Sequence, residues 1–400
     1  MKSCNVVERM VIGRINFFII NMFYMLLFVD CINGYFLEKG IVLPISQFFK
    51  ITLFFLMAFE MILVNRGKLI LWGISFYSTF IIFFFSFSVG FLYSLTFTHL
   101  FKFLLLVCSF FYLKNFISDN PQLKYGQLMK ILKINSYVLI VNILLVLIGL
   151  GNSSYGEDIG SKGYFYAPNE LSGLFAILCP CMLFYVGRKY SLSSFKYCFI
   201  LGVFLVSVFL LGTKSSIISC TISIFFISGL LVKSKRNYIR LYLLGFVIAF
   251  VIIFIGYLFL DSFGFWDRWA FFYDKGGLQL LLLSGREEYW LEEKSELLDG
   301  GIGNIIMGLG EARTVEMDMF DAFLNYGIVG LIVVYSFFFF LLYKAYHYRL
   351  INSWARVIFF IDVMLLIASS LSGHIIFSGM AGPFIALVNV LVLIPNKYIA

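Results

Sequence analysis

Charge is scarce in this sequence. Charged residues occupy 13% of its 400 positions, whereas hydrophobic residues occupy 61% and the mean hydropathy is +0.95. A water-soluble protein of this length needs a polar and charged surface that such a composition cannot supply. The composition therefore excludes a soluble globular protein and indicates a chain whose apolar surface faces lipid.

Several ligand motifs are missing as well. The sequence has no Gly-rich phosphate loop of the nucleotide-binding type. Its seven cysteines fall mostly inside apolar runs, which favours small buried side chains over a disulfide framework. Cys179 and Cys181 have no further Cys or His at ligand spacing, so no metal site and no cofactor are predicted. The net charge of +8 is not gathered in a basic run with interleaved aromatics, so no nucleic-acid partner is expected.

Long apolar runs are what the sequence does have. A bilayer core about 30 Å thick needs about 20 apolar residues per helix. We therefore predict an all-α polytopic membrane protein with about twelve transmembrane helices in a single domain, residues 1–400. The predicted spans are 13–33, 41–64, 69–92, 96–117, 131–150, 169–187, 195–211, 213–232, 239–260, 319–343, 355–373 and 376–395. The seventh and eighth meet at residues 212–214, and they form either two full spans or a broken or re-entrant pair. Because the first run leads directly into the second, no cleavable signal peptide is expected.

The distribution of basic residues orients these spans. With the N-terminus inside, eight Lys and Arg residues fall in outside segments, two lie within spans, and the other 20 fall in inside segments. An excess of Lys and Arg in short loops marks the cytoplasmic side, so both termini are predicted to be cytoplasmic. The longest inside loop, 114–130, is too short to fold a domain, which argues against an ATP-driven pump and a cytosolic sugar transferase. Space for chemistry is left in the large extracytoplasmic loop 261–318, with a smaller one at 151–168.

The large loop is predicted to contain a short helix. Ser284 and Glu287 match a capping box, with Ser284 as N-cap. On helical spacing Arg286, Trp290, Glu293 and Leu297 share one face, which suits a helix lying along the membrane surface. The neighbouring glutamates fit a solvated face without a catalytic role. Arg286 is different, because the helix dipole disfavours a cation in the first turn, and a ligand would explain its position.

Three further segments are candidates for chemistry. Lys214 follows a long apolar run beside Thr213 and Ser215, where it either snorkels to the interface or binds a phosphate. Acidic residues before the tenth span either activate a sugar hydroxyl or favour the helix start. They are Glu316, Asp318 and Asp321. The aromatic run in 163–170 either stacks on sugar rings or forms an interfacial belt, and the belt is favoured.

Charged side chains within the predicted spans are functional-site hypotheses by default. They are Asp30, Lys50, Glu60, Lys102 and Asp362. The two lysines lie in the outer halves of their helices. They either line a cationic path for a lipid diphosphate or, for one of them, pair with the aspartate. Two histidines near outer span ends, His99 and His374, have no metal partner in the sequence and stay unassigned.

The order of these motifs resembles that of the Wzy-type polymerases of O-antigens and capsules, within the wider family that includes O-antigen ligases and teichuronic-acid polymerases. The resemblance covers residues 163–330 and depends on the order and shared outside placement of the motifs. The matching segments are Gly163–Glu170, Leu211–Ser216, Ser284–Arg286 with Trp290, Gly308–Gly310 with the acidic residues that follow, and Tyr326–Gly330.

The resemblance implies a glycosyl transfer between two lipid-linked sugars at the outer face of the bacterial cytoplasmic (inner) membrane. The donor would be a glycan on undecaprenyl diphosphate, and the acceptor another lipid-linked repeat unit, with membrane lipid and a chain-length regulator protein as further candidate partners. The implied catalytic residues are Arg286, Glu316 and Asp318. The implied substrate-binding residues are Lys214, Arg313, Asn169 and Trp290.

Two departures from the family pattern bear on this prediction. Many relatives carry Arg where Lys214 stands, and Lys offers a point charge instead of a bidentate fork. Ligases carry a His ahead of the tenth span, near the place of Glu316, so its absence favours a polymerase and leaves a general base unassigned. The alternatives are a flippase for lipid-linked oligosaccharides, an O-antigen ligase, and a membrane protein whose outer loop only contacts partners. A flippase is expected to show internal repeats, and none is evident.

Overall fold

The computed structural model describes residues 6–64, 94–118, 120–154, 160–192, 194–232, 265–310, 314–371 and 373–398. Within these ranges the chain is helical, and there is no β-strand beyond an isolated bridge between Asn152 and Gly163. The α-helices are α1 Val6–Glu38, α2 Ile45–Val64, α4 Ser94–Ser118, α5 Pro121–Leu144, α6 Pro168–Tyr190, α7 Phe195–Leu211, α8 Lys214–Leu231, α10 Phe265–Leu283, α11 Arg286–Asp299, α12 Gly301–Met307, α13 Asp318–Tyr348, α14 Ser353–Leu371 and α15 Gly382–Leu391. Two 3₁₀ turns, η1 Leu145–Ile148 and η2 Asn396–Tyr398, complete the set.

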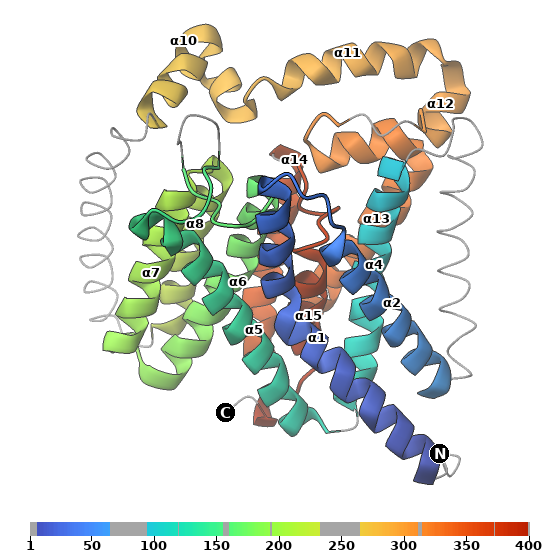
Figure 1. The fold of residues 1–400 in the computed structure, drawn as a ribbon, viewed down its shortest axis with the longest axis vertical. Coiled ribbons are helices and arrows are strands. Elements are labelled where there is room, and N and C mark those ends of the chain that lie inside the picture. The colour runs from blue at the N-terminus through green and yellow to red at the C-terminus, as the bar shows by residue number, and fades with distance from the viewer. Residues whose placement is uncertain are drawn as a thin grey trace.

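The predicted class, an all-α multi-spanning membrane protein, is confirmed. In the described residues eight helices are long and apolar enough to cross a bilayer, and α7 and α15 are shorter apolar helices. The predicted spans 69–92 and 239–260 lie outside the described residues. Helix α1 begins and η2 ends at one end of the bundle, whereas α10, α11 and α12 lie across the opposite end (Figure 1). The outer loop thus contains three helices, where we predicted one.

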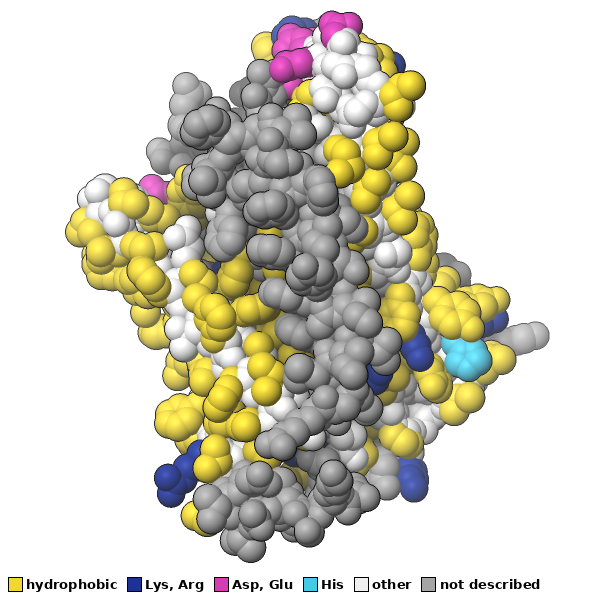
Figure 2. Space-filling model, turned by 90° about the vertical axis from the view of Figure 1, so that its right-hand side faces the viewer, with side chains coloured by type: hydrophobic (Ala, Val, Ile, Leu, Met, Phe, Trp, Pro, Cys, Tyr) yellow, Lys and Arg dark blue, Asp and Glu magenta, His cyan; other side chains and the backbone are white. Residues whose placement is uncertain are grey.

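The charged side chains on the surface also differ between the two ends of the bundle. In Figure 2 hydrophobic side chains cover most of the described surface between the two ends of this face. Acidic side chains gather at its upper end, and most of the visible Lys and Arg lie in its lower half. This distribution is what the positive-inside rule leads one to expect when α11 lies on the outer side.

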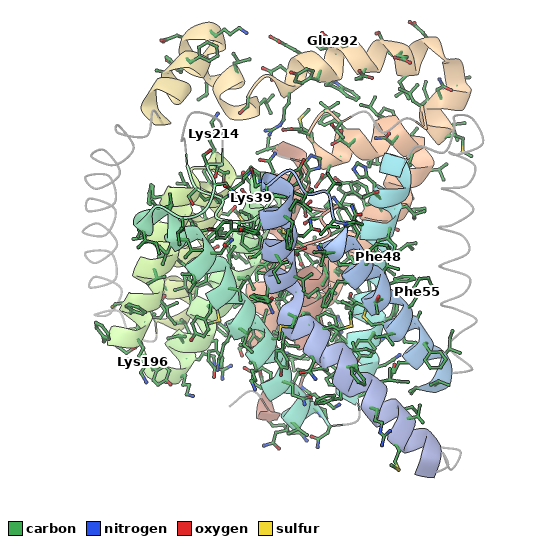
Figure 3. The ribbon with its side chains drawn as sticks, viewed as in Figure 1. Lys39, Phe48, Phe55, Lys196, Lys214 and Glu292 are labelled. Carbon is green, nitrogen blue, oxygen red and sulfur yellow. The ribbon has the colours of Figure 1, made fainter. Side chains whose placement is uncertain are left out.

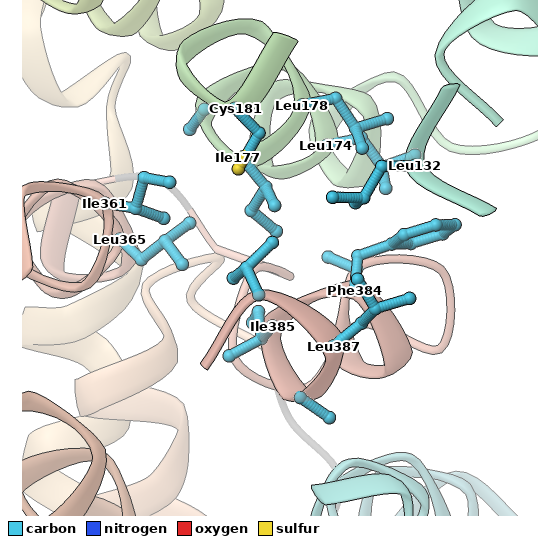
Figure 4. Packing of buried hydrophobic residues seen from close by; sticks show 14 of the residues in the cluster. Leu132, Leu174, Ile177, Leu178, Cys181, Ile361, Leu365, Phe384, Ile385 and Leu387 are labelled. Carbon is cyan, nitrogen blue, oxygen red and sulfur yellow. The ribbon is translucent and has the colours of Figure 1, made fainter. Parts of the chain in front are cut away.

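Helix α6 forms the centre of the core. Its most apolar stretch is 94% buried, against 33% to 67% for the other spans. It packs against α5, α7, α8, α14 and α15. Figure 4 shows side chains of α6 meeting those of α5, α14 and α15 in one apolar layer. Those it labels are Leu132, Leu174, Ile177, Leu178, Cys181, Ile361, Leu365, Phe384, Ile385 and Leu387.

Helices α7 and α8 form a closed antiparallel pair. Gly212 ends α7 in the left-handed region with φ of 72°, and Lys214 opens α8 after a single further residue. The Tyr197 hydroxyl near the start of α7 lies 2.9 Å from the Ser228 hydroxyl near the end of α8. The two helices therefore lie antiparallel, and they are in contact at the end opposite the turn that joins them.

The chain between α14 and α15 is irregular although it is buried. Residues 375–381 are buried, and α15 begins only at Gly382, with Pro383 in its first turn. The prediction of one continuous span over 376–395 is therefore wrong in its first six residues. Irregular backbone is tolerated at membrane depth only where protein groups satisfy its N–H and C=O groups. Two carboxylates, those of Asp318 and Glu170, serve this purpose here.

A pair of buried thiols offers a test of the α6–α8 packing. The Sγ atoms of Cys179 on α6 and Cys220 on α8 lie 3.3 Å apart. We expect a membrane-permeant oxidant such as copper phenanthroline to join them in a disulfide, detected by mass spectrometry of the digested protein. Cys181→Ser should leave this cross-link unchanged, whereas Cys179→Ser should remove it. A cross-link that instead joins Cys220 to Cys181 would show that the register of α6 and α8 is wrong.

Candidate functional site

The turn between α10 and α11 brings two predicted motifs together. Ser284 and Gly285 both have left-handed backbone, with φ of 57° and 84°. Gly285 is the N-cap of α11 and no side chain caps the helix, so the predicted capping box at Ser284 is wrong. The Ser284 hydroxyl instead accepts a hydrogen bond of 3.2 Å from Lys214 Nζ. Figure 3 shows Lys214 at the upper end of α8, beneath the layer formed by α10 and α11.

The hydroxyls beside Lys214 hold the start of α8 in place. Thr213 Oγ1 lies 2.8 Å from Ser172 Oγ on α6 and 2.5 Å from Ser216 Oγ, and all three residues are buried. These groups are bonded to one another rather than turned outward. The side chain of Lys214 is thus the group of this segment that reaches the outer layer.

Arg286 lies at the centre of the site. Its Nη2 donates to Glu316 Oε2 at 2.9 Å and its Nη1 to the Leu371 carbonyl at 3.3 Å. The Arg286 side chain is 14% exposed, and the Glu316 side chain is 47% exposed. Nε of Arg286 is buried, and in the described part of the chain no acceptor lies within hydrogen-bond distance of it. A buried donor without a protein acceptor can be satisfied by a water or by a bound ligand.

Helix α11 is held over the bundle by its apolar face, as its spacing predicted. Trp290 packs on Phe320 with ring centroids 4.5 Å apart, and Leu297 is fully buried. Glu292, labelled in Figure 3, lies on the exposed side of the helix. The contacts of Trp290 hold α11, which begins at Arg286, against the start of α13; the prediction that Trp290 binds substrate stays a prediction.

Asp318 and Asp321 organise the chain around the start of α13. Asp318 is 1% exposed, and its carboxylate accepts three backbone N–H bonds, from His374, Ile375 and Ile376, at 2.6 to 2.8 Å. Asp321 accepts from the N–H groups of two residues in the segment that leads into the helix. These contacts indicate that Asp318 positions backbone; its role as a catalytic residue stays a prediction.

Glu316 lies in a strained segment that touches this backbone. Its φ is 59°, a value that a residue with a side chain rarely adopts. Gly373 packs directly on it: a Cβ added at Gly373 would come within 2.5 Å of the Glu316 carbonyl carbon. Strained backbone of this kind persists where its surroundings over-determine it, and such positions are common in functional sites.

A second group of charges lies deeper, around the irregular segment before α15. Glu170 Oε1 pairs with Lys102 Nζ at 3.2 Å, and Glu170 Oε2 accepts from Ser378 Oγ at 2.5 Å. Lys50 Nζ pairs with Asp30 Oδ1 at 2.6 Å, which is the structural pairing that the sequence left open for Asp30. Each lysine predicted to line a cationic path therefore already has a carboxylate partner.

The remaining predicted residues lie as follows. Asn169 is half-buried in the first turn of α6, next to Glu170, and its substrate-binding role stays a prediction. Arg313 lies outside the described residues. The sequence analysis did not single out Glu170 as the partner of Lys102, although an ionisable Lys102 within a span calls for such a partner. No group of three or more His, Cys, Asp or Glu side chains that could hold a metal ion occurs in the described ranges.

The fold and this arrangement define a multi-spanning helical membrane protein with cations and carboxylates gathered beneath a surface helix. Residues 84–263 match the model of the family described as O-antigen ligase like membrane protein. The match covers a little under half of the 400 residues and includes Lys214, but it ends before α10. It supports a polysaccharide-related membrane enzyme and does not separate a polymerase from a ligase. The comparisons with curated proteins and with solved structures gave no match.

Proposed function

We propose that this protein polymerises lipid-linked oligosaccharide repeat units at the outer face of the bacterial cytoplasmic membrane. The observation that carries the proposal is the meeting of two cations from separate segments. Lys214, from the start of α8, bonds to Ser284, and Arg286 follows two residues later. A lipid diphosphate carries the negative charge that two such cations, one with a spare donor, would bind.

In the proposed reaction a sugar hydroxyl of the acceptor attacks the anomeric carbon at the reducing end of the donor glycan. The bond between that carbon and the diphosphate oxygen breaks, the undecaprenyl diphosphate leaves with the electron pair, and the proton of the acceptor hydroxyl is released to water. Arg286 and Lys214 stabilise the charge that develops on the leaving group, which is an electrostatic contribution. Glu316 keeps the guanidinium in place before substrate binds, and the diphosphate competes with it for Nη2.

A polymerase is preferred to a ligase because Glu316 stands where the resemblance places the ligase histidine. The Arg286–Glu316 ion pair gives that glutamate a role in arranging the cation. Arg313 is proposed as a further cation of the site and Asn169 as a sugar ligand, with a chain-length regulator as protein partner. The deep pairs Asp30–Lys50 and Lys102–Glu170 are proposed to be structural.

A deletion strain tests the proposed function. Without the protein, single repeat units should accumulate on the lipid carrier at the outer face while long chains vanish. Long chains that remain on the carrier and fail to reach their final acceptor would identify a ligase. Repeat units that stay at the inner face would identify a flippase.

Arg286→Ala should abolish chain growth in the complemented deletion strain, with the protein still present in the membrane. Removing one charge-stabilising donor costs about 10²–10³ in rate, and Arg286→Lys should recover part of it because a charge remains. Lys294→Ala, on the exposed side of the same helix, is the matched control and should support normal chains. Normal chain length in Arg286→Ala would remove Arg286 from the site.

A further inference from the structure

The end of the bundle opposite α11 carries a group of cations that the proposed reaction does not use. Its members are Lys133, Lys189 and Lys196, which come from α5, α6 and α7. Figure 3 shows Lys196 at the lower end of α7, at the opposite end of the bundle from Lys214. This is the end that the positive-inside rule makes cytoplasmic. Within the described ranges none of the three lysines forms an ion pair with a carboxylate, so the protein leaves their charge uncompensated.

The three lysines meet at two tyrosines of α6. Lys133 Nζ donates to the Tyr185 hydroxyl at 2.8 Å and lies 4.2 Å from the centre of the same ring. Two cations share the other tyrosine: Lys196 Nζ lies 4.2 Å from the centre of the Tyr190 ring, and Lys189 Nζ lies 5.3 Å from it. Tyr185 and Lys189 are four residues apart on α6, so they share one face of the helix. Three helices thus bring their cations to one place.

These contacts hold the lysines in place without neutralising them. A phenol and an aromatic ring carry no net charge, so an ammonium that lies against them keeps its own. An ammonium has three donors, and Lys133 uses one of them on a phenol. Lys189 and Lys196 are exposed. Lys50 and Lys102, by contrast, each have a carboxylate partner. The group at the cytoplasmic end therefore has charge available for an anion from outside the chain.

Exposed aromatic side chains continue from these cations toward the interior of the membrane. Tyr137 lies one turn beyond Lys133 on α5 and is 55% exposed. Phe199 lies one turn beyond Lys196 on α7 and is 59% exposed. Helices α5, α6 and α7 contact one another, so these side chains stand on neighbouring helices. Positive charge at the level of the headgroups, with exposed aromatic side chains one turn deeper, suits an amphiphilic anion better than a soluble one.

We propose that Lys133, Lys189 and Lys196 bind the headgroup of an anionic glycerophospholipid with two phosphate groups, a lipid of the cardiolipin class, in the cytoplasmic leaflet. Basic pockets between transmembrane helices on the cytoplasmic side are the kind of site that takes such headgroups. Three positive charges suit two phosphates better than one, and the acyl chains lie against Tyr137 and Phe199. The lipid site stands at the face opposite the candidate site for glycosyl transfer, so it does not depend on the reaction proposed above.

Binding of the lipid to the purified full-length protein tests this site. The protein is delipidated in detergent and titrated with cardiolipin, and the bound fraction is followed by native mass spectrometry. We expect the triple variant Lys133→Gln, Lys189→Gln, Lys196→Gln to bind cardiolipin about 100-fold more weakly than the parent protein, because each lysine near the headgroups contributes a factor of about five. Phosphatidylglycerol, which has one phosphate, should bind the parent protein more weakly than cardiolipin does.

A second triple variant provides the matched control. Lys114→Gln, Lys124→Gln, Lys344→Gln also removes three positive charges at the same end of the bundle, and each of these lysines lies over a phenylalanine ring. It should bind cardiolipin as tightly as the parent protein. Equal weakening in the two triple variants would overturn the proposal, because it would show a general attraction to the basic end of the bundle. Equal affinity for phosphatidylglycerol and cardiolipin would overturn the assignment of two phosphates.

A double variant keeps the test valid if the half-buried Lys133 is needed for folding. Lys189 and Lys196 are exposed, so Lys189→Gln, Lys196→Gln should unfold at the parent Tm in detergent without added lipid. We expect its affinity for cardiolipin to fall about 25-fold. Parent-like affinity in this folded variant would show that the lysines do not bind the lipid.

Discussion

Asp318→Ala is expected to destabilise the protein by several kcal/mol and to free the segment 373–376 from the bundle. The substitution leaves three N–H groups without their acceptor, the buried ones of Ile375 and Ile376 and the partly buried one of His374. Each unsatisfied buried donor costs about 1–3 kcal/mol. Because Gly373 in this segment lies against Glu316, we also expect chain growth to be lost.

Two measurements check this expectation. The Tm in detergent should fall well below that of the parent protein, and the three amides should lose their protection in hydrogen exchange. Asp318→Asn keeps one carbonyl acceptor, so its Tm should lie between those of the parent protein and of Asp318→Ala. Asp299→Ala, at the exposed end of α11, is the control and should change neither quantity. Parent-like protection of the three amides in Asp318→Ala would show that the carboxylate does not hold the segment.

The sequence predicted most of the bundle because spans depend on local composition. Apolar runs of about 20 residues mark transmembrane helices wherever they stand. The prediction of the last span, 376–395, was wrong at its start for a reason that hydropathy does not reveal. Residues 376–381 are mostly apolar, like those of a transmembrane helix. Their backbone N–H groups, however, donate to carboxylates from α6 and α13, which are distant in sequence.

The sequence predicted individual residues of the site but not the contacts that bring them together. The helical period placed Arg286 and Trp290 on one face correctly, because a face depends only on spacing. It did not predict that Lys214 would bond to Ser284, since that contact joins segments 70 residues apart. The capping-box pattern at Ser284 was misleading, because the hydroxyl is bonded to Lys214 and Gly285 begins the helix.

Left-handed backbone is a further property that the sequence conceals. At Gly327 it is readable, since glycine favours it, and there it kinks α13 where the helix lies against Ile306. At Glu316 the residue type argues against it. Such a position emerges only from tertiary contacts, here those with the backbone of Gly373.

Lys102→Met should destabilise the protein by about 3 kcal/mol, because it leaves the Glu170 carboxylate buried without its cation. Glu170→Gln should be similarly costly, since the carboxylate also accepts from Ser378 and from the Met380 N–H. In the double variant neither charge remains. Its loss in the free energy of unfolding should therefore be well below the sum of the losses in the two single variants. Thermal unfolding of the four proteins measures this coupling.

A second ion pair, between Lys162 and Glu38, provides the comparison for this double-mutant cycle. Lys162 and Glu38 are 2.7 Å apart, which is shorter than the Lys102–Glu170 distance of 3.2 Å. The two pairs differ mainly in their carboxylates, since the Glu38 side chain is 32% exposed and that of Glu170 is 11% exposed, whereas the lysines are 14% and 23% exposed. The cycle of the Lys162–Glu38 pair should give a coupling below about 1 kcal/mol. Equal couplings in the two cycles would mean that burial adds nothing to the Lys102–Glu170 pair. A larger coupling at the deep pair supports our proposal that these charges hold the segment before α15, which Glu170 contacts at Ser378 and Met380.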